Sequence, residues 1–214
     1  MAEIPEGGPA RGWGVARSPP VRRTVLLLGG GFDPPHLGHQ TVAHTVLLTG
    51  IADAVWLVPC GQHPFRKAMS KASDRLAMLE LVAGEGMTVC SEEVDRPEVS
   101  YSYETLRRLS ARHPEHRFGW VMGSEQLPSF HTWHRYEDLL REFPVYVYPR
   151  RDAPFEPLYP GMTALSQMAE VDISSTAIRL AVAEGRPIGG MVLPPVERYI
   201  RERQLYVPAH APLA

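Results

Sequence analysis

The sequence has few of the features that would place the chain in several large classes of protein. Only two cysteines, Cys60 and Cys90, occur among its 214 residues, too few for a disulfide framework or a zinc site of four thiolates. We therefore expect two free thiols and a reducing compartment. No apolar run approaches the roughly 18 residues of a membrane-spanning helix, and the run at 25–28 is too short for a signal peptide. These absences predict a soluble, cytoplasmic protein without a membrane partner.

An excess of charge of one sign is also missing. The chain has 22 lysines and arginines against 24 aspartates and glutamates, a formal net charge of -2 at pH 7. Such a balance gives no field that would hold a nucleic acid, so we expect no nucleic-acid partner. What the chain does have is 44% hydrophobic and 21% charged residues, enough to bury one core of ordinary size.

The two ends of the chain differ in composition from its middle. Residues 1–22 contain four prolines and four glycines and little apolar periodicity, which predicts a flexible leader or sequence upstream of the true start. Residues 207–214 contain Pro208 and Pro212 and are predicted to form a loose C-terminal tail. Residues 23–206 then remain as a single domain.

Within that domain, β-branched and apolar runs alternate with amphipathic segments. The runs at 24–28, 54–58, 87–91, 117–122 and 144–148 are predicted to be buried strands. Helical spacing is found at 37–48, 73–83 and 103–112, and two short C-terminal helices are predicted at 175–184 and 195–203. Strand and helix in alternation favour an α/β fold, a Rossmann-like doubly wound parallel sheet whose ligands bind beyond the carboxyl ends of the strands.

The first such end is followed by the segment GGGFDPPHLGH, residues 29–39. Its glycines let the backbone approach a ligand closely, and the helix that follows offers free amides and a positive dipole end to an anion. The segment lacks the Gly-Lys-Ser/Thr of a P-loop, and Pro34 stands where the dinucleotide fingerprint needs glycine. A dehydrogenase that binds a dinucleotide is therefore disfavoured, and a phosphate-facing loop is predicted.

Two histidines in this segment, His36 and His39, are three residues apart at the start of a predicted helix. Residues at that spacing share a face, where both imidazoles can donate hydrogen bonds to one phosphate group. A zinc site fits less well because no third ligand is close in sequence. We therefore predict a pair of phosphate-binding histidines and no protein-bound metal.

The segment at 29–39 resembles the first signature of the nucleotidyltransferase superfamily, and ISSTAIR, residues 173–179, resembles the second. Together with PPVERYIRERQLY near the C-terminus, they make residues 24–206 similar to the bacterial nicotinate mononucleotide adenylyltransferases. The resemblance implies an enzyme of NAD biosynthesis with ATP and nicotinate mononucleotide as partners. It would transfer an adenylyl group directly to the acceptor phosphate, releasing pyrophosphate and forming deamido-NAD, with Mg²⁺ carried by ATP.

The second signature can also be interpreted from the chemistry of its residues. Its hydroxyl residues lie where a helix begins, so they can cap the free amides or bind phosphate, and Arg179 follows one turn later. A capping serine with a surface arginine is the alternative interpretation. The resemblance makes His36 and His39 catalytic, and it implies an ATP-binding set of Gly30, Gly31, Phe32, His36, His39, Ser174, Ser175, Thr176 and Arg179.

Acceptor specificity is expected in the middle of the chain. SYSYETL, residues 100–106, resembles the family segment that contacts the pyridine carboxylate, with Ser102 in place of threonine. Residues 123–140 resemble the stretch whose tryptophan stacks on the pyridine ring; Trp133 has that position, although an aromatic residue there can also pack into the core. The implied acceptor-binding set is Arg66, Lys67, Tyr101, Ser102, Glu125 and Trp133.

The chain departs from the family pattern at four of these places. Glu125 replaces aspartate, Gly31 replaces threonine, and Phe65 and Arg66 replace a histidine and a lysine. Arginine binds phosphate as a fork, whereas lysine binds it as a point charge. Two alternatives therefore stay open: transfer to another acceptor (nicotinamide mononucleotide, phosphopantetheine or a polyol phosphate), or a nucleotide-binding protein without turnover. A homo-oligomer also stays open.

Overall fold

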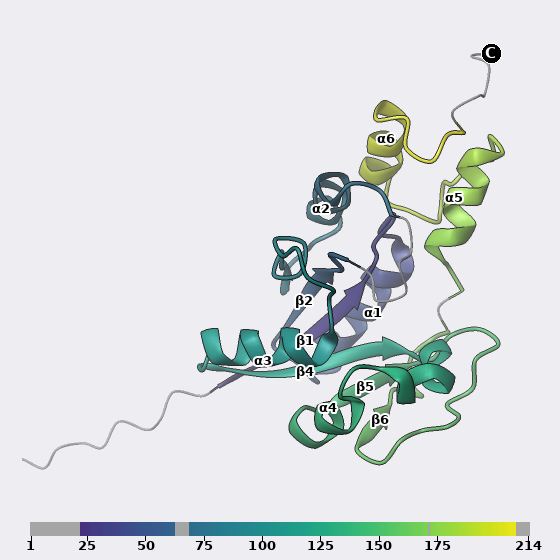
Figure 1. Ribbon diagram of the computed structural model, residues 1–214. Helices are drawn as coiled ribbons and strands as arrows, with labels where there is room; N and C mark the ends of the chain where they lie inside the picture. The colour runs from purple at the N-terminus through teal and green to yellow at the C-terminus, as the bar shows by residue number, and fades with distance from the viewer. Residues whose placement is uncertain (1–21, 63–68, 171, 209–214) are drawn as a thin grey trace, which may run out of the picture.

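The protein, described by a computed structural model over residues 22–62, 69–170 and 172–208, is built on one parallel sheet (Figure 1). Its six strands lie in the order β3-β2-β1-β4-β5-β6, and every neighbouring pair is parallel. The strands are β1 Arg23–Gly30, β2 Ala54–Pro59, β3 Met87–Val89, β4 His116–Gly123, β5 Val145–Tyr148 and β6 Met162–Ala164. This strand order reverses between β1 and β4, which confirms the doubly wound, Rossmann-like fold.

Helices connect the strands and close the chain. They are α1 Leu37–Leu48, α2 Ala72–Glu80, α3 Ser102–Arg112, α4 Tyr136–Glu142, α5 Ser175–Ala183 and α6 Pro194–Glu202, with a 3-10 helix η1 at Ser124–Thr132. The last two are the short C-terminal helices that the sequence predicts. Within the part of the chain that the structure describes, no helix is long and apolar enough to cross a membrane.

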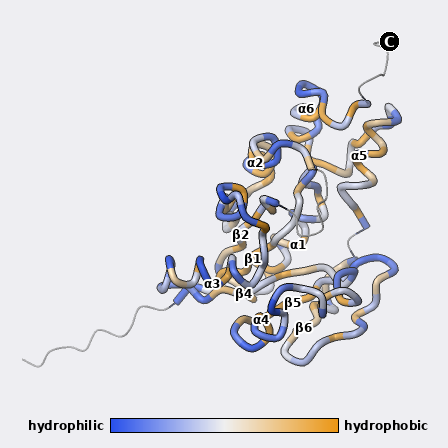
Figure 2. The backbone as a smooth tube through the Cα atoms, viewed as in Figure 1, coloured by the Kyte–Doolittle hydropathy of each residue, from blue (hydrophilic) through white to orange (hydrophobic). Residues whose placement is uncertain are grey.

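Side chains of the central strand β1 point alternately to the two faces of the sheet and belong to two separate core clusters. Leu26 and Leu28 point to the face covered by α1 and α2, whereas Val25 and Leu27 point to the face covered by α3 and α4. Burial on both faces explains why the strand is a continuous apolar run rather than an alternating one. Figure 2 shows the hydrophobic stretches mainly where strands and helices meet and the hydrophilic ones on outer loops.

A third apolar cluster attaches the C-terminal helices to the rest of the molecule. Ile178 of α5 and Val196 and Ile200 of α6 pack with Met78 of α2. The three helices gather at one end of the sheet, away from α4, β5 and β6 (Figure 1). Residues far apart in the sequence thereby surround the loop that follows β1.

The structure differs from the sequence-based prediction in its shortest elements. Strand β6 and helix α4 were not predicted, because three and seven residues carry too little periodicity to stand out. The 3-10 helix η1 was not predicted either, and it has Pro128 in its interior. The predicted strand at 87–91 was too long: β3 ends at Val89, and the Asp95 N–H closes a turn on the Ser91 carbonyl at 3.1 Å. The helix predicted at 73–83 is α2, which begins at Ala72 and ends at Glu80.

Candidate active site

The carboxyl end of β1 carries the glycine-rich loop that the sequence analysis singles out. A Cβ atom on Gly29 would lie 2.3 Å from the ring of Trp120 on the adjacent β4, so only glycine leaves room for that indole. The close fit fixes Trp120 under the loop and makes it part of the wall of the site. Beyond Gly31 the chain turns through residues 32–36 into α1.

Asp33 is the residue through which distant segments hold this loop. Its side chain is buried; Oδ1 accepts from the hydroxyl of Tyr206 at 2.8 Å, and Oδ2 accepts from the N–H of Ser70 at 3.2 Å. Its main-chain carbonyl accepts from Nη1 of Arg179 at 2.8 Å. The loop is thus fixed by the segments before α2, in α5 and after α6, in agreement with a structural role for Asp33.

The two residues before Asp33 that follow the strand, Gly31 and Phe32, are also held in place by contacts with other segments. Nη1 of the buried Arg75 donates to the Gly31 carbonyl at 2.9 Å. Phe32 has a φ of 47°, and its ring is 1% exposed and packs against the His39 ring at 4.6 Å between centroids. Of the ATP-binding residues expected from the sequence, Phe32 can therefore offer a ligand its backbone but not its side chain.

His36 and His39 meet at the start of α1. Their rings stack, with centroids 3.7 Å apart and an interplanar angle of 26°. Nδ1 of His39 accepts from the main-chain N–H of His36 at 3.2 Å, which places the hydrogen of the neutral His39 ring on Nε2. Nδ1 of His36 is buried and has no hydrogen-bond partner among the described residues. Nε2 of His39 and Nδ1 of His36 are therefore not committed to a hydrogen bond within the described part of the protein.

The electrostatic setting keeps both imidazoles neutral. Burial and, to a smaller extent, the nearby positive charge of Arg150 together lower the pKa of His36 to about 3. Burial also lowers the pKa of His39 well below its usual value, with smaller contributions from His36 and Arg150. At neutral pH the pair can donate N–H groups to a phosphate but brings no charge of its own, so the positive charge must come from arginines nearby.

The second signature forms the N-terminus of α5, beside the loop. Ser174 caps the helix by accepting from the Ala177 N–H at 3.2 Å, and the Ser175 hydroxyl donates to the Pro34 carbonyl at 2.8 Å. Nη2 of Arg179 donates to the Thr176 hydroxyl at 3.2 Å. These contacts bring the two signatures together in space, as the sequence predicts. They also show that Ser175 holds the loop with the hydroxyl expected to face phosphate.

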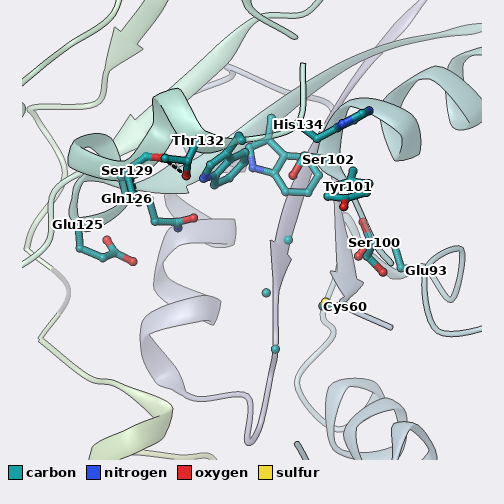
Figure 3. A pocket seen from close by; sticks show the side chains of 15 residues that line it. Cys60, Glu93, Ser100, Tyr101, Ser102, Glu125, Gln126, Ser129, Thr132 and His134 are labelled. Carbon is teal, nitrogen blue, oxygen red and sulfur yellow. Dashed lines mark hydrogen bonds between the residues drawn. The ribbon is translucent and has the colours of Figure 1, made fainter. Parts of the chain in front are cut away.

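A cavity of about 620 Å³ opens on the other side of the glycines (Figure 3). This volume suits a small-molecule ligand. Of the residues predicted to form the site, it is lined by Gly30, Gly31, Tyr101, Ser102, Glu125 and Trp133. His36, His39 and the residues of the second signature do not line it. The candidate site thus has two parts. After the roles expected from the sequence, we call residues 32–39 and 174–179 the phosphate side and the cavity the acceptor side.

Aromatic side chains form one wall of the acceptor side. Trp133 is half-buried, packs edge-on against Trp120 at 6.4 Å and against Phe130 at 5.1 Å, and still lines the cavity. Core packing and ligand contact, which the sequence left as alternatives, are thus compatible in this residue. Tyr101 and Ser102 also line the cavity, at the start of α3, and the Tyr101 ring lies 4.5 Å from that of His134 (Figure 3).

Arg150 joins the two sides and was missed by the sequence analysis. Its side chain is 17% exposed; Nε lies 3.6 Å from Oε2 of Glu125, and Nη1 donates to the Ile173 carbonyl at 2.9 Å. It follows β5 closely, and a cation just past the carboxyl end of a predicted strand is a signal that could have found it. Glu125, at the cavity, is thereby paired with a cation close to the histidines.

The remaining predictions concern the two cysteines and the cations expected to bind the acceptor. Cys60 and Cys90 are free thiols, as predicted, and Cys60 lines the cavity. Burial and the neighbouring Glu93 raise the pKa of Cys60 to about 11, so this thiol is not an activated nucleophile. Arg66 and Lys67, predicted to bind the acceptor, lie outside the described residues, as does Phe65.

Comparison with known proteins defines the class to which this fold and site belong. The sequence profile of the cytidylyltransferase-like family matches residues 27–181. A probable nicotinate-nucleotide adenylyltransferase of Halalkalibacterium halodurans is 36% identical over 189 residues, covering 86% of this chain and 91% of the relative. One from Anaeromyxobacter sp. strain K is also 36% identical over 189 residues, covering 86% and 97%.

The fold has a counterpart among solved structures. The Plasmodium falciparum nicotinic acid mononucleotide adenylyltransferase complexed with NaAD superposes with a TM-score of 0.74 at 18% identity, covering 86% of this chain and 97% of that one. The chain therefore belongs to the cytidylyltransferase-like family, and within it to the family of the nicotinate-nucleotide adenylyltransferases.

Proposed function

We propose that this enzyme transfers the adenylyl group of ATP to nicotinate mononucleotide. An oxygen of the acceptor phosphate attacks the α-phosphorus of ATP, the bond from that phosphorus to the bridging oxygen of the β-phosphate breaks, and pyrophosphate leaves with the electron pair. The products are deamido-NAD and pyrophosphate. No covalent enzyme intermediate is required, consistent with the raised pKa of the thiol at the cavity.

The observation that carries the proposal is the neutral histidine pair beside the glycine loop. The imidazoles of the buried His36 and the half-buried His39 lie at the N-terminus of α1, where the positive end of the helix dipole favours an anion, and they can act as directional N–H donors. As charge moves onto the phosphate oxygens in the transition state, such preorganised donors lower the barrier. Arg150 and Arg179 would supply the positive charge that the histidines lack.

The cavity supports a pyridine nucleotide as the acceptor. Trp133 and Trp120 offer an aromatic wall against which a flat ring can stack. The N-terminus of α3 also presents Tyr101 and Ser102 to the cavity, and a helix N-terminus favours the carboxylate of nicotinate over a neutral amide. We expect nicotinate mononucleotide to be preferred over nicotinamide mononucleotide by at least about tenfold, because donors set for an anion pair poorly with an amide N–H.

The metal requirement follows from the substrate. Among the described residues, no group of three or more histidine, cysteine, aspartate or glutamate side chains could hold a metal ion. We therefore expect Mg²⁺ to enter on the triphosphate, whose oxygens are ligands that it prefers. We also place the reaction in the cytoplasm, where ATP is available.

Pyrophosphate release tests the proposal directly. The purified chain is incubated with MgATP and, in turn, nicotinate mononucleotide, nicotinamide mononucleotide, phosphopantetheine and glycerol 3-phosphate. We expect rapid release with the first and formation of deamido-NAD, confirmed by mass. Preferential use of another acceptor would reassign the substrate, and ATP binding without turnover of any acceptor would indicate a nucleotide-binding protein.

A further inference from the structure

The chain that follows α6 returns to the loop that carries the histidines. The Leu205 N–H donates to the Ile200 carbonyl at 3.0 Å where the helix ends, and Tyr206 adopts a φ of 66°. The hydroxyl of Tyr206 then donates to Oδ1 of Asp33 at 2.8 Å. Tyr206 lies beyond residue 181, where the match to the family profile ends.

The loop needs such support because its backbone is strained. Phe32 has a Cβ atom but a φ of 47°, in the left-handed region that is unfavourable for such a residue. The next residue, Asp33, is 4% exposed, and a buried carboxylate is costly unless its oxygens accept hydrogen bonds. Tyr206 serves one oxygen and the Ser70 N–H the other. Removing either donor therefore weakens the hold on the whole loop.

We propose that Tyr206 is a positioning residue for the reaction. By donating to Asp33, it holds residues 31–36 in the conformation in which His36 and His39 face the phosphates of ATP. Turnover then depends on a side chain that touches neither substrate. The kinetic part of this inference rests on the proposed function, whereas the mechanical link between the C-terminal segment and the loop does not.

The molecule contains a natural control for this idea. Tyr199, in α6, donates its hydroxyl to Oδ1 of the buried Asp74 at 2.9 Å. The chemistry matches that of Tyr206, a phenol bonded to a buried carboxylate from the same end of the chain. Asp74, however, lies in α2 rather than in the histidine loop. Tyr199→Phe and Tyr206→Phe each remove one phenol donor from a buried carboxylate, and only the second bond is made directly to the loop. Oδ1 of Asp74 also accepts from Nη2 of Arg203 at 3.3 Å, so it keeps a partner in Tyr199→Phe.

Steady-state kinetics with MgATP and nicotinate mononucleotide distinguish positioning from simple stabilisation. We expect Tyr206→Phe to lower kcat about tenfold, the effect of losing one hydrogen bond to a charged group, while the KM for the acceptor stays within about twofold. Tyr199→Phe should keep kcat within about twofold of the wild type. Both variants should lower the melting temperature, Tyr199→Phe by less because Arg203 still donates to Asp74.

A second measurement needs no turnover. If the loop and the C-terminal segment are coupled, ATP bound at the loop must also stabilise that segment. Trypsin cleavage after Arg203, whose side chain is 57% exposed, requires the segment to open locally. Saturating MgATP should slow this cleavage several-fold in the wild type and in Tyr199→Phe, and much less in Tyr206→Phe.

Each arm has a result that would overturn the inference. Wild-type kcat in Tyr206→Phe, or equal losses of kcat in the two variants, would reduce Tyr206 to a stability contact. Equal protection by ATP in the wild type and Tyr206→Phe would remove the link itself. If the wild type turned over no acceptor, the proposed function would fail, and the protection experiment would still decide whether the C-terminal segment controls the loop.

Discussion

The phosphate side and the acceptor side of the site are held in different ways. Around the histidines, hydrogen bonds from Ser70, Arg75, Arg179 and Tyr206 fix the backbone of one short loop. The acceptor side is an open cavity whose wall is set by packing of large aromatic rings such as Trp133. The difference suggests that the chemistry needs a rigid loop, whereas acceptor selection uses a shaped surface.

Breaking the phosphate side should have the largest effect. We expect His36→Ala or His39→Ala to lower kcat by about two to three powers of ten, because one donor aimed at developing charge contributes about 3 kcal/mol. The affinity for ATP, measured by calorimetry, should change little. His44→Ala, an exposed position on the same helix, is the matched control and should retain full activity. Equal loss in affinity and kcat would remove the histidines from the catalytic role.

Arg179 tests whether the second signature serves ATP. Arg179→Ala should raise the KM for ATP by about tenfold or more, since a hydrogen bond to a charged group is worth roughly 1.5–3 kcal/mol. Arg179→Lys should restore only part of this, because an ammonium cannot reach both the Asp33 carbonyl and the Thr176 hydroxyl as the guanidinium does. Wild-type ATP dependence in Arg179→Ala would contradict the assignment.

The acceptor side should respond separately from ATP. We expect Trp133→Ala to weaken nicotinate mononucleotide binding by about 1–3 kcal/mol, by analogy with bases stacked on aromatic side chains. Trp133→Phe keeps a smaller aromatic ring, so its affinity for nicotinate mononucleotide should lie between those of the wild type and Trp133→Ala. ATP affinity should stay nearly constant in both variants, and a parallel loss of ATP affinity would show that the two sides are not independent.

Acid should destabilise the phosphate side through its buried histidines. The pKa of His36 falls from 6.5 to about 3 on folding, so between these values the unfolded chain binds more protons than the folded one. The free energy of unfolding is therefore unaffected by this group above pH 6.5 and decreases as the pH falls below it, by up to about 1.4 kcal/mol per pH unit. His36→Asn, which puts a residue favoured at helix N-caps at this N-cap position, should show a shallower decline in urea midpoints between pH 7.5 and 4.5. An unchanged decline would contradict the prediction.

The smallest expected effect is at Gly31, where the two sides meet. A Cβ atom there would meet only Sδ of Met69, at 3.4 Å, so Gly31→Thr should fold normally. The added hydroxyl should lower the KM for the acceptor a few-fold, since one hydrogen bond contributes about 1 kcal/mol. Gly61 serves as the control for a crowded position. A Cβ atom there would lie 2.2 Å from the Glu93 carbonyl oxygen, so Gly61→Ala should lower the melting temperature markedly. Poor folding of Gly31→Thr would show that the space is not free.

Local patterns in the sequence were enough to predict most of the sheet and the core of the phosphate side. Apolar runs are found at five of the six strands, and the spacing of His36 and His39 correctly puts both rings at the start of α1. Strand β6, with three residues, falls below what periodicity can detect. The Asp33 contacts could not be predicted, because donors such as Tyr206 are 173 residues away and have no local signature.

The acceptor side was less accessible to sequence reasoning for a related reason. Tyr101, Ser102 and Trp133 were selected by resemblance, and the cavity does bring them together. Arg150 was missed because its importance comes from its neighbours: an arginine shortly after a strand is ordinary until Glu125 and the two histidines are placed beside it. Charge interactions between separate loops depend on tertiary structure, which no single segment encodes.

The hydrogen bond between Asp33 and Tyr206 also bears on how the enzyme is made. Its two partners are 173 residues apart, so the first strand and the histidine loop emerge from the ribosome long before the donor that fixes them. Domains fold during synthesis from the N-terminus onward, at about 5–20 residues per second. The bond cannot form until residue 206 has left the exit tunnel, so a nascent chain shorter than this would lack the fixed loop.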